Sequence, residues 1–143
     1  MNFVLDSSLA LAFVLEDEAA PATDQILDTL GQGARALVPA LWRWEVANVL
    51  VLAERRKRIS SAAAHRHLAH LKSLPIEVDE TALEEAWSAT HLLAHKHKLT
   101  SYDAAYLEMA IRHGLALGSL DVELRSAAKV EQVPLLPAKL ARQ

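Results

Sequence analysis

The chain has 143 residues, of which 52% are hydrophobic and 23% are charged, a composition typical of a globular protein about one domain long. It contains no cysteine, which excludes disulfides, thiolate nucleophiles and cysteine zinc sites and suits a reducing cytosol. The formal net charge of −3 provides no global attraction to nucleic acid, so a polynucleotide would need a local basic patch or a bound metal ion.

Short β-type runs alternate with helical patterns along the chain. Strands are predicted at 3–5, 36–38, 76–78, 115–117 and 133–136. Helices are predicted at about 8–17, 22–30, 40–57, 61–73, 80–97, 101–113 and 122–128. This alternation predicts an α/β layer fold with a mainly parallel sheet.

The sequence shows no division and no targeting segment. It has no internal repeat and no linker, so a single domain is expected over residues 1–143. The start MNFVLD lacks the basic and long apolar segments of a signal peptide, and no run of about 18 apolar residues predicts a membrane span. We therefore expect a cytoplasmic protein without membrane contact.

Four acidic residues fall where a parallel sheet usually binds its ligand, beyond the carboxyl ends of the strands. Asp6 follows the first strand and Asp121 follows the fourth, whereas Asp103 and Glu45 lie in the first turns of predicted helices. Each alone could simply cap or favour a helix N-terminus. Together they predict an all-oxygen site for Mg²⁺ or Mn²⁺, because clustered carboxylates repel one another unless a cation neutralises them.

The segments that carry these acids resemble the signature blocks of the PIN-domain ribonucleases, and especially the VapC-type toxins of bacterial toxin–antitoxin pairs. The segments are Phe3-Val4-Leu5-Asp6-Ser7-Ser8, Pro39-Ala40-Leu41 leading to Glu45-Val46-Ala47-Asn48, Ser101-Tyr102-Asp103-Ala104-Ala105-Tyr106, and Gly118-Ser119-Leu120-Asp121. Each block alone is weak, but the ordered set runs from the first residues to about Ala128 and is specific.

The resemblance implies a PIN-like three-layer α/β/α sandwich and a metal-dependent endoribonuclease. It assigns Asp6, Glu45, Asp103 and Asp121 to Mg²⁺, for which Mn²⁺ can substitute, with Asp6 and Asp103 as the direct ligands and Asp121 or Glu45 able to orient the attacking water. The supporting residues that it implies are Ser8, Ser119 and Asn48. This chain has Gly118 at a position where the family more often has Ala or a similar small residue, and we expect this difference to have little effect on the site.

The same resemblance implies partners. They are a VapB-like antitoxin that reaches the acidic pocket with a basic side chain, an RNA substrate, and a second copy in a homodimer, with a heterotetramer or larger assembly when the antitoxin is bound. DNA would be contacted only through the antitoxin. An apparent surplus of apolar helix surface at Trp42, Val46 and Leu50 could serve these contacts.

Other groups have two interpretations. The basic run Arg55-Arg56-Lys57-Arg58, with Arg43, could contact RNA phosphates or merely form a charged helix end. Trp42 and Trp44 point to different sides of one helix, so one should pack inward while the other meets a partner or stacks on a base. The seven histidines lack a third zinc ligand in a known arrangement and are best explained as a solvated face.

Competing functions are mostly excluded. A dinucleotide site needs a glycine-rich turn after the first strand, where this chain has Asp6-Ser7-Ser8. An Asp-x-Asp phosphatase fails because Ser8 occupies the second position, and a receiver domain would need two adjacent acids. The alternative that stays open is a non-catalytic PIN-like module that binds RNA or a protein.

Overall fold

A five-stranded parallel sheet forms the centre of the computed structural model, which describes residues 1–140. The strands are β1 (Phe3–Leu5), β2 (Ala36–Val38), β3 (Ile76–Val78), β4 (Ala116–Gly118) and β5 (Leu135–Leu136). They lie in the order β3-β2-β1-β4-β5, and every neighbouring pair is parallel. The prediction of a mainly parallel sheet is confirmed, and the carboxyl ends of the central strands share one edge.

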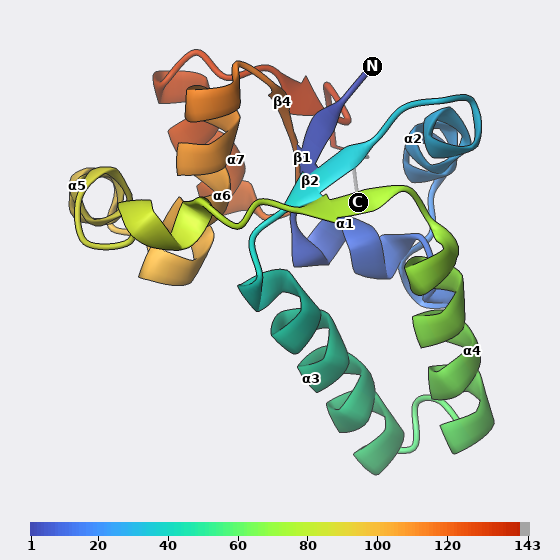
Figure 1. Ribbon diagram of the computed structural model, residues 1–143. Coiled ribbons are helices and arrows are strands. Elements are labelled where there is room, and N and C mark those ends of the chain that lie inside the picture. Colours follow the sequence, from blue (N-terminus) through green and yellow to red (C-terminus); the bar gives the residue numbers. More distant parts are fainter. Residues whose placement is uncertain (141–143) are drawn as a thin grey trace.

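Helices cover both faces of the sheet. They are α1 (Ser7–Ala12), α2 (Pro21–Gly31), α3 (Leu41–Arg55), α4 (Ser61–Ser73), α5 (Ala89–His97), α6 (Ser101–His113) and α7 (Val122–Val130), with two 3₁₀ turns, η1 (Glu16–Glu18) and η2 (Ala82–Glu85). Figure 1 shows α6 and α7 on one side of the strands and α1 and α2 on the other. The arrangement is the expected three-layer α/β/α sandwich, and α3 and α4 extend away from it as a hairpin.

Two predicted helices are shorter than expected. The helix expected at 8–17 ends at Ala12, and Leu15 is extended. Residues 13–15 are all buried, so the core dictates their path and the sequence there has no exposed helical face. The helix expected at 80–97 is divided into η2 and α5, because the backbone of Ser88 leaves the helical region between them, with φ −124° and ψ −100°.

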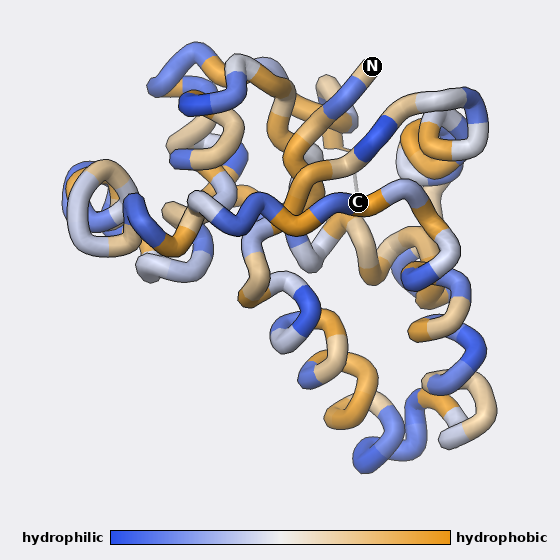
Figure 2. Tube along the Cα trace, in the orientation of Figure 1, coloured by the Kyte–Doolittle hydropathy of each residue, from blue (hydrophilic) through white to orange (hydrophobic). Residues whose placement is uncertain are grey.

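The core is built around the strands. Phe3, Val4 and Leu5 are completely buried, as expected for a parallel strand covered on both faces. Figure 2 shows hydrophobic colour along the central strands and mixed colour along the outer helices. Tyr106 and Leu107 of α6 are also fully buried, so α6 packs tightly on the sheet.

The expected surplus of apolar surface on α3 is wrong. Trp42, Val46 and Leu50 are only 6%, 2% and 1% exposed, because their face of the helix packs into the hydrophobic core. Trp44 is 79% exposed on another face. The expectation that only one of the two tryptophans packs inward is therefore confirmed.

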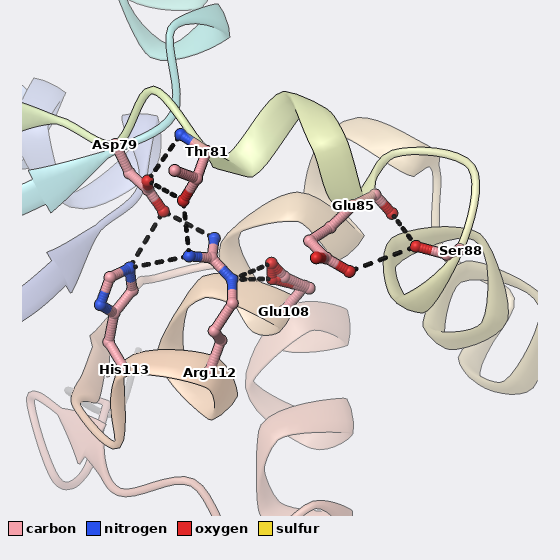
Figure 3. A network of polar contacts seen from close by, with 7 residues as sticks. All are labelled: Asp79, Thr81, Glu85, Ser88, Glu108, Arg112 and His113. Atoms are coloured by element: carbon pink, nitrogen blue, oxygen red, sulfur yellow. Dashed lines mark hydrogen bonds and ion pairs between the residues drawn. The ribbon is translucent and has the colours of Figure 1, made fainter.

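A network of ion pairs fixes the chain after β3 to the end of α6 (Figure 3). The Asp79 carboxylate accepts hydrogen bonds from the Thr81 hydroxyl at 2.6 Å, an Arg112 terminal nitrogen at 2.6 Å and His113 Nε2 at 3.0 Å. Arg112 Nε also donates to Glu108 at 2.8 Å. Burial raises the pKa of Asp79, but the bonds from Thr81, His113 and Arg112 outweigh it and hold the pKa well below its usual range.

Within residues 1–140, no helix has both the length and the apolar character needed to cross a membrane.

Candidate active site

Asp6 is a buried carboxylate directly after β1. Its side chain accepts hydrogen bonds from the Leu9 backbone N–H at 2.9 Å and the Ser8 hydroxyl at 2.7 Å, and from the Ser119 hydroxyl on its other oxygen. The backbone N–H of Asp6 donates to the carbonyl of Gly118 at 3.0 Å, which ties the end of β1 to the end of β4. Asp6 is therefore an N-cap and also a carboxylate only 4% exposed at the sheet edge.

Asp121 is held beside Asp6 by the segment that follows β4. The Asp121 N–H donates to the Ser119 hydroxyl at 3.1 Å, and the Leu120 N–H donates to the Ser8 hydroxyl at 2.9 Å. The Asp121 carboxylate caps α7 by accepting from the Leu124 N–H at 2.9 Å. The structure thus places Ser8 and Ser119 between the two aspartates.

Glu45 and Asp103 come from α3 and α6, which meet at this edge. The Tyr106 hydroxyl donates to Oε1 of Glu45 and joins the two helices. Asp103 lies three residues before Tyr106, in the first turn of α6, which Thr100 caps by accepting from the Asp103 N–H at 3.1 Å. Asn48 is exposed one turn beyond Glu45.

The acids influence one another electrostatically. Burial raises the pKa of Asp6 to about 6 against its hydrogen bonds, and the charge of Asp121 adds to the rise. The pKa of Asp103 is raised by burial and then by Asp121. Burial also raises the pKa of Glu45, and Asp103 raises it further, whereas the Tyr106 hydrogen bond lowers it.

These effects connect the four acids in a row, each next to another, at one edge of the sheet. Among residues 1–140, however, no three His, Cys, Asp or Glu side chains stand close enough together to hold a metal ion as they are placed. The donors still fit a hard divalent cation by their chemistry, because they are all carboxylates whose repulsion a cation would relieve.

Two contributors to the site were missed in the sequence. Tyr106 holds Glu45 across 61 residues of chain. Arg125, only 5% exposed, donates to the carbonyl of Ser119 at 3.0 Å and to that of Ala138 at 3.3 Å, and so fixes the segment after β4. Burial lowers the pKa of Arg125, and the charge of Asp6 opposes this. The only signal in the sequence was helical spacing, since Arg125 lies four residues after Asp121.

Most of the basic residues predicted to contact RNA lie away from the acids. Arg55 ends α3 ten residues beyond Glu45, which corresponds to about 15 Å of helix rise. Arg58 Nη2 pairs with Asp17 at 2.6 Å on the surface. Arg43 is exposed near the start of α3, closer to the acids. A role for these residues in RNA binding stays a prediction.

Gly118 is closely surrounded by neighbouring atoms. A Cβ at this position would lie 2.7 Å from Cδ2 of Leu9 and 3.2 Å from the carbonyl oxygen of Val4. Gly118→Ala is therefore expected to lower the free energy of unfolding by about 1–3 kcal/mol, measured by urea denaturation. Gly31→Ala is the control, because a Cβ there meets nothing within 4 Å. Equal stability of the two variants would contradict close packing at Gly118.

Comparison with known proteins agrees with this fold. The chain resembles PAE2754 of Pyrobaculum aerophilum at 25% identity, with a TM-score of 0.70 over 96% of this chain and 90% of that one. It also shares its fold with VapBC2 of Rickettsia felis (11% identity, TM-score 0.66, 94% and 97% of the two chains) and FitAcB of Neisseria gonorrhoeae (16%, 0.61, 95% and 96%). No curated protein matches the sequence significantly. The family model of the PIN domain matches residues 3–130, and the chain therefore belongs to the PIN domain family.

Proposed function

We propose that this protein is a Mg²⁺- or Mn²⁺-dependent endoribonuclease and the toxin of a toxin–antitoxin pair. PIN domains are typically nucleases, which supports a hydrolase. The observation that carries the proposal is Asp6, a carboxylate 4% exposed with a pKa near 6, which lies next to Asp121 at the end of the row of four acids. A fold keeps such an unfavourable group where a cation or a reacting group compensates for it.

The four acids would have different roles in such a site. Asp6 and Asp103 would hold the metal ion, and Glu45 and Asp121 would complete its surroundings directly or through water. A bound divalent ion lowers the pKa of a coordinated water and stabilises charge on the attacked phosphate. Tyr106 fixes one oxygen of Glu45, and Ser119 fixes Asp6 and the backbone of Asp121, so these carboxylates are oriented before a substrate arrives.

The partners belong to the same proposal. One structure of the same fold is described as VapBC2 bound to a DNA fragment from their promoter, which supports a two-component assembly. We propose a VapB-like antitoxin that neutralises the nuclease, a homodimer of this chain, and contact with DNA only through the antitoxin. The setting for these partners would be the cytoplasm.

The test is cleavage of RNA by the purified protein. The wild type with Mn²⁺ should cut RNA, and excess chelator should stop it. Asp103→Asn, which removes one charge at nearly constant shape, should not cut. If neither the wild type nor Asp103→Asn cuts RNA, the alternative of a non-catalytic binding module is supported, and equal cleavage by both would contradict an active site at these acids. Gel filtration with the product of the neighbouring gene tests the antitoxin, and the proposal of a pair fails if the two proteins elute apart.

A further inference from the structure

A hollow of about 250 Å³ lies between α7 and the chain that follows β5, and we call it the basic hollow. Three of the side chains that line it are cationic, namely Arg125, Lys129 and Lys139, and Ser126 lines it as well. Within residues 1–140 no acidic side chain lines it, and Glu123, the one acid of α7, lines a different hollow. Cations grouped with a hydroxyl suit an anion that accepts several hydrogen bonds, above all a phosphate group.

The two lysines of the basic hollow are open to a ligand. Lys129 and Lys139 are exposed, and neither forms an ion pair with any residue of the described part of the chain. Arg58, in the basic run after α3, differs from them because it pairs with Asp17 at 2.6 Å. The ammonium groups of the lysines therefore retain their three donors each for a bound anion.

Arg125 adds a fixed positive charge beneath the lysines. It is only 5% exposed, and its terminal nitrogens donate to the backbone carbonyls of Ser119 and Ala138. In residues 1–140 it has no carboxylate partner. A guanidinium stays charged when it is buried, and a buried charge without a counter-ion is unfavourable. An anion bound in the basic hollow would provide part of the missing compensation.

Helix α7 connects the basic hollow to the acidic site. Asp121 caps this helix, and Arg125 and Lys129 follow at intervals of four residues, so they lie along one side of it. Lys129 is eight residues from Asp121, which corresponds to about 12 Å of helix rise, and helical side chains tilt back toward the N-terminus. Burial lowers the pKa of Arg125 and the charge of Asp6 opposes this, which agrees with a guanidinium near the acids. An RNA strand cleaved at the acids can therefore reach the hollow within a few nucleotides.

We propose that the basic hollow is a phosphate subsite of the nuclease, which binds a backbone phosphate of the RNA a few nucleotides from the cleaved bond. Lys129 and Lys139 donate to the phosphate oxygens, and Arg125 strengthens the positive potential below them. The subsite rests on the proposed ribonuclease function. It meets a need of this chain, because a protein with a net charge of −3 attracts a polyanion only through a local basic site. Contacts to phosphates position the strand and do not read its bases.

The salt dependence of RNA binding is the first test. A fluorescein-labelled single-stranded RNA of about ten nucleotides is titrated by anisotropy in Mg²⁺ at several KCl concentrations, with Asp103→Asn as the background so that the RNA stays intact. Adding Lys129→Ala and Lys139→Ala should weaken binding about 5-fold at ~0.1 M salt. The slope of log K against log salt should become shallower by about 0.7 for each phosphate contact that is lost. Lys129→Arg with Lys139→Arg should retain both values, because the charges are kept.

The matched control for Lys129→Ala alone is Lys72→Ala. Lys72 is an exposed lysine at the end of α4, which leads into β3, and β3 and β5 are the opposite edges of the sheet. This variant removes the same charge far from the basic hollow, so the affinity for RNA and its salt slope should stay close to those of the parent protein.

The kinetics of cleavage are the second test. In the active protein with Mn²⁺, the double variant Lys129→Ala/Lys139→Ala should raise KM for RNA about 5-fold and change kcat less than about 2-fold, because the lysines touch no reacting atom. Its melting temperature should equal that of the wild type, since both side chains are exposed and without an ion-pair partner in the described chain.

Each outcome decides between the subsite and its alternatives. A wild type that cuts RNA, together with a double variant that keeps the same KM, affinity and salt slope, would overturn the subsite. So would a double variant that loses only the affinity for the antitoxin, because the hollow would then receive an acidic protein segment. If the slope falls as expected but the wild type cuts no RNA, the nuclease proposal fails, and the hollow is the phosphate site of a non-catalytic RNA-binding module.

Discussion

Asp6→Asn is expected to abolish metal-dependent cleavage and at the same time to stabilise the metal-free protein. Cleavage should fall at least about 100-fold, because the substitution removes a charge that holds the metal ion. The fold should gain because Asp6 is buried with a pKa raised to about 6, so its ionised form opposes folding. An amide retains the cap to the Leu9 N–H without the buried charge.

The sign of the pH dependence follows from that pKa. The carboxyl of Asp6 binds its proton more tightly in the folded protein than in the unfolded chain, where its pKa is about 3.9. This contribution to stability is complete at low pH and is lost as the pH rises through about 6. The melting temperatures of wild type and Asp6→Asn should therefore converge near pH 4. Above pH 6 the melting temperature of Asp6→Asn should be the higher one, and the two free energies of unfolding should differ by at most about 3 kcal/mol.

Thermal melts in chelator from about pH 4 to pH 8 measure this difference. Addition of Mn²⁺ should raise the melting temperature of the wild type and have little effect on Asp6→Asn, because binding to the folded state stabilises it. Asp28→Asn, at an exposed position on α2, is the control and should change neither property. If Asp6→Asn were less stable than the wild type at pH 8 in chelator, the ionised form of Asp6 would not be destabilising the folded protein.

The layers of this fold could be predicted because local patterns agree with the final structure. The runs around Val4 and Leu117 are apolar on both faces, as a covered parallel strand requires, and Pro21 and Gly114 mark helix ends that the structure retains. The split at Ser88 could not be predicted, because residues 80–97 contain no Gly or Pro to mark the point where the backbone of Ser88 leaves the helical region.

The position of the acids could also be predicted, because chain order alone puts Asp6 and Asp121 after strands that end at one edge. Their two interpretations turned out to be compatible, since both cap a helix and both lie beside the other acids. The residues that position the acids were not predictable. The bond from Tyr106 to Glu45 and the contact of Arg125 with Ser119 exist only after α6 and α7 have packed. Nor did periodicity reveal that Trp42 faces the core, because the pattern does not say which face of α3 is covered.

Arg112→Met is expected to lower the free energy of unfolding by about 3–5 kcal/mol. Arg112 lies between two carboxylates, with its terminal nitrogen 2.6 Å from Asp79 and its Nε 2.8 Å from Glu108 (Figure 3). The side chains of Asp79 and Glu108 are only 6% and 4% exposed. Methionine keeps much of the apolar stem but leaves both carboxylates without their guanidinium partner, and an uncompensated buried charge is far more costly than a lost surface ion pair.

The control for Arg112→Met is Arg35→Met, which breaks the ion pair with Glu77. That pair has side chains 62% and 54% exposed, so its loss should cost less than about 1 kcal/mol. Urea denaturation of both variants at about pH 7 gives the comparison. Because the pKa of Asp79 is lowered in the fold, its contribution is present above the unfolded pKa of about 3.9 and is lost at lower pH. The excess cost of Arg112→Met should therefore shrink on acidification.

The network matters to the site because of where it is attached. It ties the chain after β3 to the C-terminal end of α6, and the first turn of the same helix carries Asp103. Loss of this tie should loosen α6 as well as lower the stability, so Arg112→Met should also lower the rate of RNA cleavage measured below its melting temperature. If Arg112→Met destabilises no more than Arg35→Met, Thr81 and His113 are sufficient to compensate the Asp79 carboxylate, and α6 is held in place by its packing against the sheet.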